Sequence, residues 1–100
     1  MIICYVTCKN KKQANKISNS VIKEKLAACA NIFPVESMYQ WKGKICHVKE
    51  TVLILKTTAR LWKQLKLRVN ALHDYELPCI IKINAKANAP FEQWIQYQTK

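Results

Sequence analysis

The stretch that decides the fold is residues 29–56, which reads CANIFPVESMYQWKGKICHVKETVLILK. Cys29, Phe33, Val35, Tyr39 and Trp41 are apolar and share one parity, which is the period of a β-strand. Gly43 is the only glycine of the chain and the natural place for the positive φ that a tight hairpin turn requires. The chain then returns through residues 44–56, so we expect two long antiparallel strands. Pro34 cannot donate to a ladder and predicts a bulge, a bend or an edge position.

This hairpin is expected to be longer than the body of the protein. About 14 residues per arm, at roughly 3.3 Å each, span about 45 Å, whereas a compact domain of this length is only about 34 Å across. The far end carries Met38, Tyr39 and Trp41, an apolar cluster that a soluble monomer does not normally expose. Overhanging strands also favour strand addition from a neighbour. We therefore expect a cyclic homo-oligomer that buries the arms.

The flanking segments complete an α+β pattern. An apolar β-rich run predicts a strand over residues 2–7, and helical spacing after Asn10 predicts a helix over 11–26. A second helix is expected from a cap at Thr57 or Thr58 to about His73, followed by a strand over 77–85 and a short closing helix from Asn88. The order β-α-β-β-α-β with a C-terminal helix predicts a single ferredoxin-like (split β-α-β) domain over residues 1–100: a four-stranded antiparallel sheet with two helices on one face.

Composition and charge narrow the class of protein. The chain has 100 residues, of which 50% are apolar, but no apolar run approaches the roughly 20 residues that cross a bilayer, so no membrane association is expected. The first eight residues resemble a strand more than a signal peptide, which predicts a cytoplasmic protein.

Lys and Arg number 17 against six acids, for a net charge of +11. The lysines are scattered and only two residues are Arg, so nucleic-acid recognition is not expected, although nonspecific polyanion binding remains an alternative.

Catalytic signatures are missing from the sequence. It contains no Gly-rich phosphate loop, no H-E-x-x-H and no G-x-S-x-G turn, and a pairing of His47 or His73 with a thiol is not favoured over a structural role. We therefore expect no enzymatic activity. The five cysteines include no C-x-x-C pair, and we expect each of them to be a small buried hydrophobic side chain.

Metal ligands and cleft residues are better candidates. Cys46 and His47 are adjacent near the turn, and Cys79 follows His73 in the segment LHDYELPC, so ligands suited to copper or zinc are present. Neighbouring residues on a strand point to opposite faces, so Cys46 and His47 could share an ion only at an irregularity or with help from another subunit. Further candidates are polar residues near the ends of predicted elements, where clefts commonly lie, namely Glu50, Lys56, His73, Tyr75 and Glu76.

Five collinear blocks resemble the CutA divalent cation tolerance family. They are EKLAACANI at 24–32, MYQWKGKI at 38–45, LILKTT at 53–58, HDYELPCI at 73–80 and Trp94-Ile95. The resemblance implies a ferredoxin-like, PII-like homotrimer, with long hairpins that interlock around a threefold axis. It also implies a role in the response to copper and other divalent metals, and a pocket between subunits. In this chain that pocket would use Cys29, Trp41, Glu50, Lys56, His73, Tyr75 and Glu76.

The chain departs from this family pattern at two places. Asp74 replaces a usual Pro, and Cys79 replaces a usual Glu. The segment after Gly43, commonly acidic in the family, here contains Cys46 and His47, so binding of hard ions should be weaker and copper or zinc favoured. An alternative function is a PII-like module that binds an anionic small molecule in the clefts between subunits, where Lys56 would supply charge.

Overall fold

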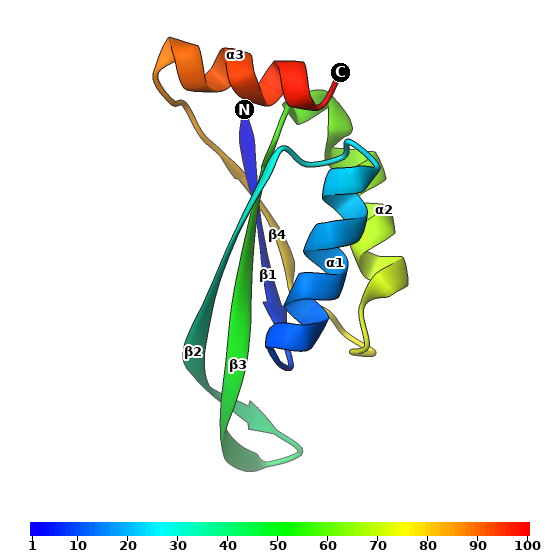
Figure 1. Cartoon of the computed structure of the whole chain (residues 1–100). Coiled ribbons are helices and arrows are strands. Elements are labelled where there is room, and N and C mark those ends of the chain that lie inside the picture. The colour runs from blue at the N-terminus through cyan, green and yellow to red at the C-terminus, as the bar shows by residue number, and fades with distance from the viewer.

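The computed structural model describes residues 1–100 and contains one antiparallel sheet and three α-helices. The strands β1 (Ile2–Cys8), β2 (Cys29–Trp41), β3 (Lys44–Thr57) and β4 (Ile80–Asn84) lie in the order β2-β3-β1-β4. Helices α1 (Lys11–Lys23) and α2 (Trp62–Leu72) lie side by side on one face, while α3 (Ala89–Gln98) crosses the end of the sheet farthest from the hairpin turn (Figure 1). This is the expected ferredoxin-like α+β fold. No helix combines the length and the apolar character that a membrane crossing requires.

The core lies between the sheet and the two helices. In β1 every second side chain is buried, from Ile2 to Cys8, because that face of the strand meets α1 and α2. Ile17 and Val21 of α1 are fully buried against it. Burial of each such side chain contributes roughly 1.5–3 kcal/mol, so the helical face of the sheet is the main source of stability.

Three element boundaries differ from the predictions. Helix α1 ends at Lys23 instead of residue 26 because Lys25 adopts a left-handed φ of 60°, which an α-helix cannot continue. Thr57 belongs to β3, and a short 3₁₀ turn η1 (Ala59–Leu61) precedes α2, with no capping bond from the Thr58 side chain. Strand β4 is shorter than residues 77–85. It begins only after Pro78, which has no N–H to give to the ladder.

The long hairpin is confirmed. Lys42 and Gly43 have φ of 51° and 78°, as a two-residue turn with two left-handed positions requires. Strands β2 and β3 pair without a bulge from Cys29 opposite Lys56 to Trp41 opposite Lys44, and Pro34 lies on an edge strand as one of its predicted options allows.

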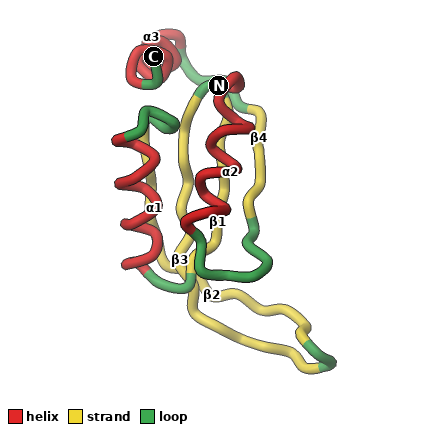
Figure 2. The backbone as a smooth tube through the Cα atoms, turned by 90° about the vertical axis from the view of Figure 1, so that its right-hand side faces the viewer, coloured by secondary structure: helices red, strands yellow, loops and turns green.

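Beyond the sheet the hairpin continues as a two-stranded ribbon. Strand β1 pairs with β3 only over residues 51–57, so residues 35–50 have no third strand beside them; we call this segment the ribbon (Figure 2). It makes the molecule 46 Å long but only 24 and 21 Å across. The overhang expected from the sequence is therefore present.

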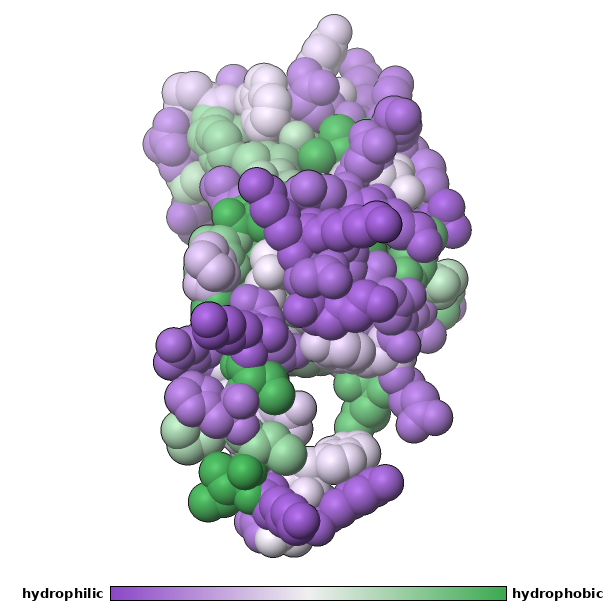
Figure 3. All heavy atoms as spheres, turned by 60° about the horizontal axis from the view of Figure 1, so that its bottom comes forward, coloured by the Kyte–Doolittle hydropathy of each residue, from purple (hydrophilic) through white to green (hydrophobic).

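Apolar side chains also cover surfaces that no helix reaches. Register places Ile81 opposite Tyr5 and Ile83 opposite Ile3, on the sheet face that points away from α1 and α2. Ile81 and Ile83 are 46% and 44% exposed, and Met38 and Ile45 of the ribbon are 67% and 76% exposed. Figure 3, which looks at the ribbon end, shows green apolar spheres on the projecting part of the molecule. These surfaces are more apolar than a solvated sheet face requires.

Candidate functional site

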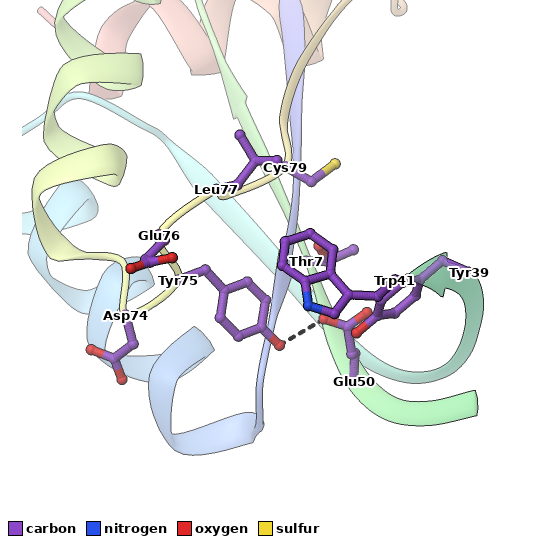
Figure 4. A pocket seen from close by; sticks show the side chains of 9 residues that line it. All are labelled: Thr7, Tyr39, Trp41, Glu50, Asp74, Tyr75, Glu76, Leu77 and Cys79. Atoms are coloured by element: carbon purple, nitrogen blue, oxygen red, sulfur yellow. Dashed lines mark hydrogen bonds between the residues drawn. The ribbon is translucent and has the colours of Figure 1, made fainter. Parts of the chain in front are cut away.

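A cavity of about 590 Å³ lies where the ribbon, the end of β1 and the loop after α2 meet. Tyr75 reaches from the loop toward Glu50 of β3, and Tyr39 and Trp41 close the cavity from the ribbon (Figure 4). Three of the chain's six acidic residues line it, and none of its lysines or arginines does. The lining residues are Thr7, Tyr39, Trp41, Glu50, Asp74, Tyr75, Glu76, Leu77 and Cys79.

A hydrogen bond between loop and strand forms the centre of this cavity. The Tyr75 hydroxyl donates to Glu50 Oε2 at 2.7 Å. Burial, together with this contact to Glu50, raises the pKa of Tyr75, so the phenol stays a donor at neutral pH. Beneath it, burial and to a smaller extent the charge of Glu50 raise the pKa of Cys8 to about 11. Cys8 is therefore a thiol rather than a thiolate at neutral pH, and a poor metal ligand.

His73 braces the loop and does not point a free nitrogen into the cavity. Its Nε2–H donates to the carbonyl oxygen of Thr7 at 2.8 Å, and its Nδ1 accepts from the backbone N–H of Tyr75 at 3.1 Å. The His73 and Tyr75 rings also lie 4.8 Å apart, measured between centroids. Because both ring nitrogens are engaged, His73 positions Tyr75 in this conformation and has no lone pair left for a metal ion.

Gln13 of α1 is a second brace, and the sequence did not single it out for this role. Its side chain is 4% exposed, its Oε1 accepts from the backbone N–H of Asp74 at 2.9 Å, and its Nε2 donates to the carbonyl oxygen of Leu72 at 3.4 Å. Asn10 Oδ1 caps the helix by accepting from the backbone N–H of Gln13, while the Gln13 side chain turns to the loop. An amide on the buried face of a helix was the only signal available.

Asp74 also makes the stability of the folded protein depend on pH. A hydrogen bond from Lys9, 2.6 Å away, holds the pKa of Asp74 below its ordinary value of 3.8. A carboxylate whose pKa is depressed by folding adds stability at pH above that ordinary value, and the contribution disappears as pH falls through the lower folded pKa. We expect wild type to be more stable than Asp74→Asn above pH 3.8 and the difference to vanish in stronger acid, as thermal unfolding across pH would measure. A difference that stays constant with pH would contradict this assignment.

The predicted pocket residues fall into two groups within one chain. Trp41, Glu50, Tyr75 and Glu76 line the cavity, and His73 braces it. Cys29 and Lys56 pair with each other at the opposite end of the hairpin. Lys56 lies six residues from Glu50 along β3, or about 20 Å, and its Nζ sits 5.4 Å from the centroid of the Phe91 ring. The predicted pocket between subunits therefore stays a prediction.

The candidate metal ligands also lie apart. No three His, Cys, Asp or Glu side chains come together closely enough to hold a metal ion within one chain. Cys46 is opposite Tyr39 and His47 is opposite Met38, so Cys46 and His47 point to different faces of the ribbon, as alternation requires. Cys79 lines the cavity, whereas the ring of His73 is occupied. A complete site would need water or residues of another chain.

The expectation that every cysteine is buried is right for two of the five. Cys4 and Cys8 are fully buried, and burial raises the pKa of Cys4 to about 12. Cys29, Cys46 and Cys79 are only partly buried, because they lie at the start of β2, on the ribbon and in the loop before β4. All five are free thiols.

Comparisons with known proteins agree with this architecture. A protein family described as CutA1 divalent ion tolerance protein matches residues 2–98. The divalent-cation tolerance protein CutA of Pyrococcus horikoshii is 41% identical over 100% of the chain and 99% of its own length. The chloroplastic protein CutA of Arabidopsis thaliana is 39% identical over 99% of the chain, which spans only 56% of that relative.

Solved structures show the same fold. The PII-like protein CutA from Nostoc sp. PCC 7120, in its apo form, is 30% identical and superposes with a TM-score of 0.91, covering 100% of this chain and 98% of its own. The fold is thus shared, over the whole length of this chain, with a PII-like protein.

Proposed function

Because the chain belongs to the CutA1 divalent ion tolerance family, we propose that it is a homotrimer that binds copper or another divalent metal and takes part in the response to metal ions. This family is a tolerance and signalling family and not a known family of enzymes. We propose accordingly that the protein acts by binding and not by catalysis.

The observation that carries the proposal is the outward-facing apolar surface of the sheet and ribbon. In β4 the residues on the helical face include Lys82, whereas Ile81 and Ile83 face away from the helices. Apolar side chains on the side without helices are stabilised only if something covers them. A second and third copy of the chain would cover this face and would also support the two-stranded ribbon, whose edges are otherwise open.

Assembly would also bring the two groups of predicted pocket residues together. Within one chain Cys29 and Lys56 lie about 20 Å from Glu50 along the hairpin. Packing of one subunit's sheet end against the ribbon of the next would join them to the cavity that holds Trp41 and Tyr75. The pocket would then be a cleft between subunits, as the family resemblance implies.

The donor atoms favour a soft or borderline metal. Cys79 and His47 are partly or largely accessible, and sulfur and imidazole ligands suit copper and zinc better than magnesium or calcium. The alternative, an anionic ligand in the cleft, is less well supported by the charges. Glu50, Asp74 and Glu76 make the cavity negative, while Lys56 lies at the far end of the hairpin. We further propose a cytoplasmic location, because five free thiols suit a reducing compartment.

Native mass spectrometry of protein loaded with copper tests the proposal. We expect a trimer that retains copper after desalting and does not retain magnesium supplied at the same concentration. A stable monomer would contradict the assembly, because the exposed apolar face would then need no cover. A trimer that keeps no copper would contradict metal binding and leave the cleft to a different ligand.

A further inference from the structure

The face of the ribbon that points away from the cavity carries three side chains with metal-site chemistry. Met38 is directly opposite His47 in the β2-β3 ladder, and Glu36 lies two residues before Met38 on the same face. Directly opposite and diagonal positions on one face bring side chains within reach of one another. His47 Nε2 and Glu36 Oε2 are 3.2 Å apart. We propose that Met38 and His47 bind copper and that Glu36 positions the imidazole.

The contact between Glu36 and His47 selects the nitrogen that would face the metal. An ionised carboxylate only accepts hydrogen bonds, so Nε2 of His47 carries the hydrogen and Nδ1 keeps a lone pair. A histidine that ligates a metal commonly donates its other N–H to a carboxylate in this way. The only other histidine, His73, has both nitrogens engaged. His47 is therefore the one imidazole of the chain that is free to bind.

Met38 supplies the second ligand. Its side chain is 67% exposed in the chain, beyond the end of the supported sheet. The thioether sulfur is a soft ligand that prefers copper(I), and imidazole also suits copper. Magnesium and calcium prefer sets of oxygen ligands, and one carboxylate is too few for them.

Cys46, the thiol next to His47, is not part of this group. It is opposite Tyr39 on the other face of the ribbon, and its Sγ–H donates weakly to the carbonyl oxygen of Lys44 at 4.0 Å. Proximity in the sequence makes Cys46 the obvious partner of His47, whereas strand alternation makes Met38 the nearer one. Copper binding through Cys46 and copper binding through Met38 therefore predict different outcomes in a mutational test.

The assignment rests on the proposal that the protein binds copper, and competition for copper(I) against a chromogenic chelator tests both separately. We expect wild-type protein to take copper(I) from the chelator, and His47→Ala and Met38→Leu each to lose at least about tenfold in affinity. Glu36→Ala should lose roughly 10- to 100-fold, the range seen when an outer partner of a ligating histidine is removed. Cys46→Ser is the matched control on the opposite face and should bind as wild type does.

Each result decides something different. If wild type takes no copper, copper binding itself is wrong. If wild type binds but His47→Ala and Met38→Leu bind equally well, the metal lies elsewhere and this site is wrong. A loss in Cys46→Ser as large as that in His47→Ala would also overturn the assignment. The four side chains are at least partly exposed, so circular dichroism should show unchanged folding, and native mass spectrometry should show unchanged assembly.

Discussion

Replacing both Ile81 and Ile83 by lysine is expected to convert the assembled protein into monomers. The two side chains point away from α1 and α2 and are 46% and 44% exposed in the single chain. Because each is only about half exposed in the single chain, cover by neighbouring subunits contributes about half the value for full burial, or roughly 0.7–1.5 kcal/mol for each side chain. Losing both removes about 1.5–3 kcal/mol per subunit, and every 1.4 kcal/mol changes an equilibrium constant about tenfold. Introduced lysine charges would weaken association further.

Sedimentation velocity over a dilution series measures this effect, with Leu67→Lys as the matched control. Leu67 is 59% exposed on α2, on the side of the helix away from its buried residues Leu65 and Val69. A lysine there adds one positive charge, where the double variant adds two, to a surface that the proposed assembly leaves free, so assembly should persist. A double variant that still sediments as wild type would show that the open sheet face is not the interface. Dissociation of Leu67→Lys would point to net charge as the cause.

The fold could be predicted from the sequence because the signals that determine it are local. The alternation up to Trp41 and the single glycine at position 43 determine the hairpin, and the structure keeps both. The overhang followed from chain length alone. Errors occurred where a local backbone choice decided the boundary, as when Lys25 took a left-handed conformation that the sequence pattern would have assigned to a glycine.

The candidate site could be predicted only in part, because the contacts that brace it join residues far apart in the sequence. Glu50 and Tyr75 could be chosen as polar residues near the ends of elements, and the structure brings them together. Gln13 contacts the end of α2 and the loop after it, 59 and 61 residues further along the chain, and no local pattern encodes such contacts. The outward direction of Ile81 and Ile83 was hidden as well. The run from Ile80 to Ile83 is apolar at both parities, so only the pairing with β1 decides which face it presents.

Replacing Gln13 by alanine is expected to destabilise the protein and to loosen the wall of the cavity. The amide is 4% exposed and joins α1 to both the end of α2 and the start of the loop. Its removal leaves a partly buried backbone N–H and carbonyl without their side-chain partners, which costs about 1 kcal/mol, the lower end of the range for buried groups. Asp74 would lose one of its two anchors and keep only the exposed ion pair with Lys9. Tyr75, next in the chain, should then hold Glu50 less firmly.

Ser18→Ala separates this effect from the general cost of a buried polar group on α1. Ser18 is also buried on α1, but its hydroxyl donates only to the carbonyl oxygen of Ala14 in its own helix, at 2.7 Å. That bond competes with the helix ladder, so its loss should change stability little. Chemical denaturation should therefore rank Gln13→Ala well below Ser18→Ala, and amide exchange should rise at Asp74 and Tyr75 in Gln13→Ala alone. Equal losses would mean that the loop is held mainly by His73, whose two hydrogen bonds fix Tyr75 to the end of β1.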